Sequence, residues 1–181
     1  EIRSIAALLQ KAKDMDIPDD IRDKFWTVTV YYNSLKDLGK ASTMVDDDVK
    51  DFMKRMCFRL KSSSDVRSIG TADELTSRLT TTELNRTLDK LEKMEYSAEN
   101  IKNRVFPANI VLATNMISVG IDVARLNVML LVGQPKLTSE YIQASSRVGR
   151  EYPGMAFVMY DGGKSRDRSH YEQFRPYHES F

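Results

Sequence analysis

Hydrophobic and polar positions alternate along the chain in blocks, and each kind of block predicts a different element. Short apolar runs rich in β-branched and aromatic residues predict buried strands. They lie at 24–32, 109–113, 128–132 and 154–160. Longer segments with apolar positions at helical spacing predict helices at 2–15, 46–55 and 80–96. Strands that alternate with helices are typical of a parallel sheet covered by helices, so the pattern predicts an α/β fold.

The segment 24–41 predicts a strand, a polar turn and a helix. Asn33 and Ser34 follow the strand, and they offer an N-cap to a helix that begins at Leu35. Three successive aspartates, Asp46 to Asp48, predict the start of a second helix, because negative charge is favourable near a helix N-terminus. An acidic metal site is the alternative interpretation of these aspartates. The pattern also indicates a short strand at 57–60, and a strand that leads into a turn at 74–79.

Composition limits the class of protein. With 181 residues, 41% of them hydrophobic and 29% charged, the chain has the size and make-up of one soluble globular domain. A net charge of +1 means that any nucleic-acid contact must come from local placement of cations. The single cysteine, Cys57, excludes an internal disulfide framework and suits a reducing compartment. No apolar run approaches the ~20 residues that span a bilayer, and we expect a cytoplasmic protein.

Polar residues with suitable chemistry for a nucleotide or a phosphate follow the strand at 109–113. Thr114 offers a hydroxyl and a backbone amide to a phosphate. Gly120 permits a close approach of the backbone, and Asp122 presents two acceptor oxygens of the kind that hold ribose hydroxyls. An ordinary turn cap is the alternative role for Asp122. Ligand sites of open parallel sheets lie beyond the carboxyl ends of the strands, and these residues fit that location.

The next candidates lie in a predicted helix at 139–150. Gln143, Arg147 and Arg150 are spaced i, i+4 and i+7, so they would share one helix face. Guanidinium groups gathered on one face repel each other unless an anion lies opposite, and they match phosphate oxygens bidentately. The alternative is a pair of surface arginines matched with Glu140 and Glu151.

These two segments resemble a known family. ATNMISVGID, at 113–122, resembles motif V of superfamily 2 helicases, and YIQASSRVGR, at 141–150, resembles their motif VI. Both motifs belong to the second of the two RecA-like lobes. The amino-acid sequence of the motifs is most similar to the helicase subunits of bacterial DISARM-type antiphage defence systems. The resemblance implies a RecA-like parallel sheet with helices on both faces. We expect a helical lead-in at 1–23, this lobe at 24–160 and a connector at 161–181 that packs on the domain or leads into a following one.

The resemblance also implies roles for individual residues. Arg150 would be an arginine finger, with Arg147 beside it at the phosphates. Gly120, Asp122 and Gln143 would face the nucleotide. Residues expected to contact the nucleic-acid backbone are Thr114 and Asn115 in motif V, and Asn33 and Ser34 at the position of motif IV. Val119 and Ala144 stand where the common RNA helicases have arginines, which favours DNA over RNA.

The sequence lacks the motifs with which the N-terminal lobe of such a motor binds ATP. Gly163-Lys164-Ser165 is similar to the end of a P-loop, but Val158 stands where the first glycine is needed, so we expect a flexible turn. The sequence has no DExH-type acidic motif of the kind that binds Mg²⁺ in such motors. His170 and His178 have no neighbouring cysteines that could complete a zinc site. We therefore expect a piece of a longer protein, in which an N-terminal lobe makes most of the contacts to ATP and Mg²⁺. By itself the piece would hydrolyse little ATP.

The expected partners are nucleic acid, that N-terminal lobe and other subunits of the defence system, with no membrane. Two alternatives remain open. One is a non-catalytic RecA-like module that binds nucleic acid or protein. The other is a P-loop kinase built around Lys164.

Overall fold

A computed structural model describes residues 1–60, 65–114 and 123–181, and its centre is one sheet of five parallel strands. The strands are β1 (Val28–Tyr32), β2 (Asp73–Leu75), β3 (Ile110–Ala113), β4 (Val128–Val132) and β5 (Met155–Met159). Their order across the sheet is β2-β3-β1-β4-β5, and every neighbouring pair is parallel. The predicted α/β fold of the RecA-like type is confirmed. Because all strands run the same way, their carboxyl ends meet at one edge.

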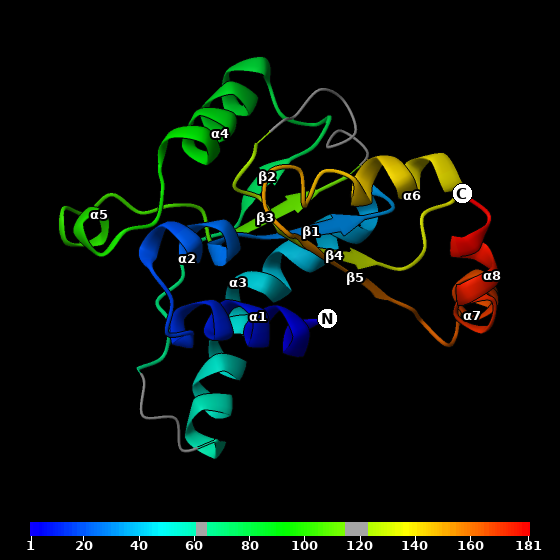
Figure 1. Ribbon diagram of the computed structural model, residues 1–181, viewed down its shortest axis with the longest axis horizontal. Helices are drawn as coiled ribbons and strands as arrows, with labels where there is room; N and C mark the ends of the chain where they lie inside the picture. Colours follow the sequence, from blue (N-terminus) through cyan, green and yellow to red (C-terminus); the bar gives the residue numbers. More distant parts are fainter. Residues whose placement is uncertain (61–64, 115–122) are drawn as a thin grey trace.

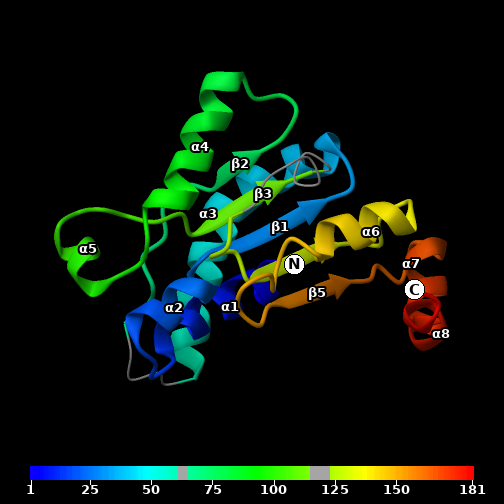
Figure 2. The same cartoon turned by 45° about the horizontal axis from the view of Figure 1, so that its top comes forward.

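Helices cover both faces of the sheet (Figure 1). The first face carries α1 (Ile2–Asp14) and α3 (Leu35–Arg59), and the second carries α4 (Thr81–Lys93) and α6 (Thr138–Ser145). Shorter helices complete the chain: α2 (Asp19–Trp26), α5 (Ala98–Lys102), α7 (Ser165–Glu172) and α8 (Phe174–Glu179). Figure 2 shows α7 and α8 beyond the end of β5, on the side of α6. No helix in the described ranges is long and apolar enough to cross a membrane.

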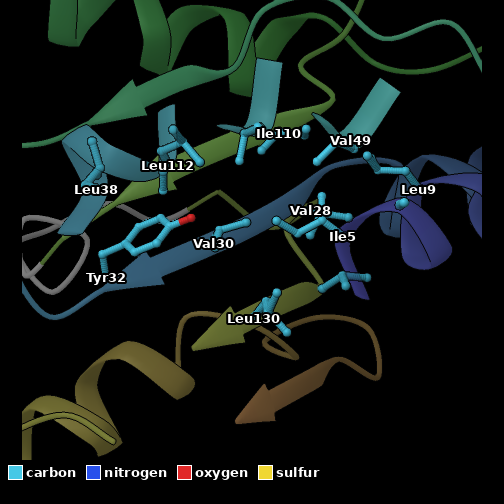
Figure 3. Close-up of a cluster of buried hydrophobic side chains, with 14 of the residues drawn as sticks. Ile5, Leu9, Val28, Val30, Tyr32, Leu38, Val49, Ile110, Leu112 and Leu130 are labelled. Atoms are coloured by element: carbon cyan, nitrogen blue, oxygen red, sulfur yellow. The ribbon is translucent and has the colours of Figure 1, made fainter. Parts of the chain in front are cut away.

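Strand β1 lies at the centre of the sheet and sends side chains to both faces. Val28, Val30 and Tyr32 pack on α1 and α3, in the cluster drawn in Figure 3. Tyr31, which points the other way, packs in the cluster that includes Leu91 of α4 and residues of α6. This period of two is what an extended chain imposes, and it explains why all five residues of β1 are buried.

Three predictions in the first third of the chain are wrong. The run at 24–32 is not all strand, since α2 continues to Trp26 and β1 begins only at Val28. The aspartates at 46–48 do not start a helix, and no strand forms at 57–60. Both segments belong to α3, which runs unbroken for 25 residues from its Ser34 cap, although Leu60 lies just past its end. The apolar positions of α3 recur every three or four residues and pack on α1 and the sheet, which outweighs the local preference of the aspartates. These positions are Leu38, Ala41, Val45, Val49 and Met53.

A buried arginine holds the amino-terminal ends of two strands. The N–H groups of Arg67 donate to the carbonyl oxygens of Leu9 and Trp26, at 3.0 and 2.8 Å, and to Oδ1 of Asn109 at 2.8 Å. Its guanidinium lies 3.5 Å from the ring centroid of Trp26, and burial lowers its pKa to about 9. Trp26 precedes β1 and Asn109 precedes β3, so this one side chain aligns α1 with both strands.

A buried ion pair connects α2 to the second face. Nη2 of Arg125 lies 2.5 Å from Oδ1 of Asp23, and its Nε donates to Oδ2 at 3.1 Å. The remaining guanidinium nitrogen donates to the backbone oxygens of Leu91 and Met94, at the end of α4. Both charged side chains are at most 4% exposed. Neither charge could be hydrated if its partner were removed.

We predict that Arg125→Met destabilises the domain by about 3–5 kcal/mol, because the carboxylate of Asp23 would remain buried without its partner. Equilibrium unfolding in urea measures this change. Arg78→Met is the matched control: Arg78 pairs with Glu74 at 2.5 Å, but 47% of its side chain is exposed, and we expect a cost below about 1 kcal/mol. Equal losses in the two variants would contradict the prediction.

Candidate nucleotide and nucleic-acid surfaces

The carboxyl edge of the sheet collects polar residues from three neighbouring strands. Asn33 follows β1, Thr114 follows β3, and Gln134 lies two residues beyond β4. The parallel register places the ends of these strands side by side, with Tyr31 opposite Ala113 and Tyr32 opposite Val132. The structure therefore brings Asn33 and Thr114, predicted from separate motifs, to the same edge.

Within the described residues, Thr114 has unused hydrogen-bonding capacity at this edge, as has Oε1 of Gln134. The backbone N–H of Thr114 donates to the carbonyl oxygen of Leu75 at 3.4 Å. Its hydroxyl is buried and has no hydrogen-bond partner in the part of the chain that the structure describes. Buried polar groups nearly always have a partner, so an unpaired hydroxyl at the end of a strand suits a site that gains a ligand.

Asn33 and Ser34 have structural partners. The amide nitrogen of Asn33 donates to the carbonyl oxygens of Val132 and Gln134, at 3.2 Å each, and so ties the end of β1 to the loop after β4. The hydroxyl of Ser34 accepts from the backbone N–H of Asp37 at 3.1 Å, as the predicted N-cap of α3. These contacts hold the turn after β1 in place.

Three predicted residues, Asn115, Gly120 and Asp122, lie at 115–122, outside the described residues. Their expected roles, a backbone contact to nucleic acid for Asn115 and a nucleotide contact for Gly120 and Asp122, therefore stay predictions. The chain that follows is described from Val123, and it leads through Asn127 into the amino-terminal end of β4.

The predicted helix at 139–150 is too long. Helix α6 ends at Ser145, so Gln143 lies in its exposed last turn, whereas half-buried Arg147 and exposed Arg150 lie beyond it in turns. The three side chains do not share one helix face as the spacing predicted. Two serines and a glycine explain the early end.

Ser145 and Ser146 bond back to carbonyl oxygens of their own helix, that of Tyr141 at 2.8 Å and that of Gln143 at 3.3 Å. Such bonds compete with the regular helix pattern. Gly149 then adopts a φ of +78°, which favours glycine. A Cβ on Gly154 would lie 2.5 Å from the backbone nitrogen of Gly149, so both positions exclude larger residues.

The segment that carries the two arginines lies at the amino-terminal end of β4, away from the carboxyl edge. The backbone N–H of Gly149 donates to Oδ1 of Asn127 at 3.1 Å. Asn127 directly precedes β4 and follows Asp122 by five residues. The arginine segment of motif VI therefore does not lie at the carboxyl edge, where Thr114 lies. The arginines instead lie beside the chain that leaves motif V, with Nε of Arg150 donating to the carbonyl oxygen of Ser146 at 3.4 Å.

The last twenty residues pack against α6 and the loop that precedes it. Nε2 of His178 lies 2.8 Å from the hydroxyl of Tyr141, and Nδ1 lies 2.7 Å from the carbonyl oxygen of Phe174. Because a carbonyl can only accept, Nδ1 carries a proton, and in the neutral imidazole Nε2 then accepts from the hydroxyl of Tyr141. Burial raises the pKa of Tyr141 and keeps this donor protonated. A contact between His178 and the motif VI helix was not predicted, since nothing in the sequence pairs these positions.

Asp167 is the main anchor of this tail. Its carboxylate is 2% exposed and accepts from the backbone N–H of Gln134 at 3.0 Å and of Asp161 at 2.9 Å, which joins the loops after β4 and β5. Gly133, at φ +79°, fits beneath it, because a Cβ there would lie 3.1 Å from Oδ2 of Asp167. An aspartate in a mixed-charge tail gives no sequence signal of this role.

The alternative sites gain little support. Lys164 is exposed and lies 3.8 Å from Asp161, at the end of a turn at 162–164. A turn was expected here, and the helix that follows it, α7, is polar. Val158, in place of the first P-loop glycine, lies inside β5. Asp46, from the aspartate run, accepts from the backbone N–H of Ala72 at 3.1 Å. No group of three or more metal-ligating side chains occurs among the residues that the structure describes.

Comparison with known proteins places the chain in a family. Residues 67–151 match the family described as helicase conserved C-terminal domain. The chain is 40% identical, over 98% of its length, to the DISARM protein DrmA of Bacillus paralicheniformis. The chain therefore contains a helicase C-terminal domain, matched over residues 67–151. It spans 15% of the length of that relative, so the rest of such a protein lies outside it.

Solved structures support the fold of this helicase C-terminal domain. The DUF1998 helicase MrfA, in a complex with DNA and AMPPNP, is similar over 97% of this chain and 20% of its own, with a TM-score of 0.58 and 16% identity. Domain 2 of the DEAD-box helicase Mss116p, bound to an RNA duplex, is similar over 87% of this chain and 49% of its own. Its TM-score is 0.50, with 15% identity. Both likenesses concern the fold.

We predict that Asp167→Asn lowers the free energy of unfolding by about 1–3 kcal/mol. An asparagine keeps one acceptor oxygen but turns an N–H group toward one of the two backbone N–H donors. Urea unfolding measures the loss. Glu172→Gln, on the same helix and 64% exposed, is the control and should stay within about 0.5 kcal/mol of the unchanged protein. The interpretation fails if Asp167→Asn is as harmless as the control.

Proposed function

We propose that this domain is the C-terminal motor lobe of an ATP-dependent helicase or translocase, most similar to those of bacterial antiphage systems. It would work with an N-terminal lobe of the same protein, and that lobe would make most of the contacts to ATP and Mg²⁺. Arg150, with Arg147 beside it, would reach across the cleft between the lobes to the triphosphate. One observation carries this proposal: the N–H of Gly149 bonds to Asn127, which keeps the arginine segment beside the chain leaving motif V.

The chemistry of the arginines supports this role. Phosphoryl transfer relies on positioning and on positive charge that neutralises the phosphate oxygens in the transition state. Turns closed by Gly149 can direct a side chain out of the domain, which a continuous helix packed on the sheet would restrict. Gly120, Asp122 and Gln143 are proposed to complete the nucleotide side.

Nucleic acid is proposed to bind at the other end of the sheet, along the carboxyl edge. Thr114 would give its unpaired hydroxyl to a backbone phosphate, with Asn115, Asn33 and Ser34 alongside it. We propose DNA as the substrate, because the arginine positions of the common RNA helicases hold Val119 and Ala144. Binding at one end and hydrolysis at the other would let closure of the two lobes pull on the strand. We further propose that the full protein acts in the cytoplasm beside other subunits of its defence system.

We predict that Arg150→Ala in the full-length protein reduces DNA-stimulated ATP turnover by about 10³-fold or more, because an arginine finger contributes roughly 10³ to 10⁵ in rate. ATP binding, measured with a fluorescent analogue, should change little. Arg175→Ala, an exposed arginine in α8, is the control and should keep full activity. A non-catalytic module would have no turnover to lose, so absence of ATPase activity in the unchanged full-length protein would refute the motor.

We predict that Thr114→Val weakens binding of single-stranded DNA by about fivefold, the size expected for one lost hydrogen bond near 1 kcal/mol. Fluorescence anisotropy with a labelled oligonucleotide measures this change in the full-length protein. Thr114→Ser keeps the hydroxyl and should bind like the unchanged protein. Equal affinities for the valine and serine variants would remove Thr114 from the nucleic-acid surface.

A further inference from the structure

A groove of about 440 Å³ lies between the first turn of α1 and the last two turns of α3. Figure 1 shows the end of α3, in teal, running past α1 and away from the sheet. The 25 residues of this helix exceed what the short strands need, at 1.5 Å rise per residue. Its last turns therefore extend beyond the layer that they cover.

The walls of the groove are largely apolar. Ile2, Phe52 and Met56 are half-buried in it, and Leu60 is at its end. Leu60 is 72% exposed and the neighbouring Phe58 is 87% exposed, the two highest values for large apolar side chains in the described ranges. Large apolar side chains clustered at one exposed place are typical of a surface that meets another molecule.

Among the described residues, the charged side chains that line the groove belong to arginines. Arg3, Arg55 and Arg59 lie around it, and no acidic side chain lines it. Arg3 lies over the ring of Phe52 at 6.0 Å, and Nε of Arg55 donates weakly to the carbonyl oxygen of Asp51 at 3.3 Å. Within the part of the chain that the structure describes, none of the three guanidinium groups pairs with a carboxylate.

The spacing on α3 gives the groove its pattern. Phe52, Arg55, Met56 and Arg59 stand at i, i+3, i+4 and i+7, so apolar and cationic side chains share one stripe of the helix. Amphipathic segments dock on such stripes by matching apolar anchors and opposite charges. The complementary segment has large apolar residues with acidic residues beside them.

We propose that this groove is a docking site for a polypeptide segment in which acidic side chains flank large apolar ones. Nucleic acid fits it less well. A phosphate backbone that followed the arginines would lie against the apolar side chains of Ile2, Phe52 and Met56. The groove is also built from α1 and α3, whereas Thr114 lies at the carboxyl edge of the sheet. The proposal therefore stands apart from the motor function.

Site-specific photo-cross-linking in the full-length protein tests this docking site. Because this domain spans 15% of the length of the DrmA relative, the expected source of the segment is the same full-length protein. A benzoylphenylalanine in place of Leu60 should cross-link to a peptide of that protein rich in acidic and large apolar residues, and a link to a co-expressed subunit alone would contradict this. Mass spectrometry identifies the linked peptide. The matched control carries the probe in place of Tyr171, which is 69% exposed on α7, and should not link to that peptide.

Charge variants then test the recognition. Arg55→Glu combined with Arg59→Glu should reduce the cross-linked yield at least about tenfold, because like charges that face each other across an interface are strongly unfavourable. Arg55→Lys with Arg59→Lys should retain most of it. Raising the salt concentration should lower the yield of the otherwise unchanged Leu60 probe protein, which tests the charge without altering the fold.

Three further outcomes would overturn the proposal. They are cross-links to nucleic acid alone, a linked peptide without acidic residues, and a yield at Leu60 no higher than at Tyr171. A yield that changes neither with salt nor with the glutamate pair would equally show that the arginines do not select the partner. Loss of ATPase activity is not a readout here, so failure of the motor proposal would leave this result intact.

Discussion

Burial of both faces of the parallel sheet is the constraint on which the other features depend. Every residue of β1 and β3 is buried, so these strands can carry only side chains that pack. The polar groups that we propose as ligand contacts lie just beyond a strand, as Thr114 does, or in the turns between elements, as Arg147 and Arg150 do. Buried cations such as Arg67 and Arg125 remain inside only because carbonyl oxygens or a carboxylate surround them.

Much of this architecture was predictable from local patterns. The runs that became β3 and β4 are short, apolar and rich in branched residues, and both strands lie where they were expected. The cap at Ser34 was identified correctly, and the helix predicted at 80–96 begins with a capping box at Thr80. For the candidate site, the sequence identified Thr114, whose place at the end of β3 follows directly from the strand.

Long-range contacts account for what the sequence could not predict. The aspartates of α3 predicted a helix start, because neighbouring residues in the sequence do not reveal that Val45 and Val49 pack against the sheet. The spacing of Gln143, Arg147 and Arg150 fits a helix, yet Asn127, from before β4, holds Gly149 in a turn. Gly149 and the arginines beside it lie near the amino-terminal end of β4, so the two proposed surfaces lie at opposite ends of one sheet.

The contacts of Asp167 indicate that the folded domain extends beyond the last strand of the sheet. The last strand ends at Met159, yet the backbone N–H groups of Gln134 and Asp161 are satisfied only by a side chain from α7. His178 and Tyr177 add contacts to Tyr141 and Gln134. A protease that removed everything after Tyr160 would remove these hydrogen-bond acceptors and the contacts to Tyr141, and would thereby destabilise α6. Limited digestion should therefore yield a resistant core that retains the two small helices beyond the sheet.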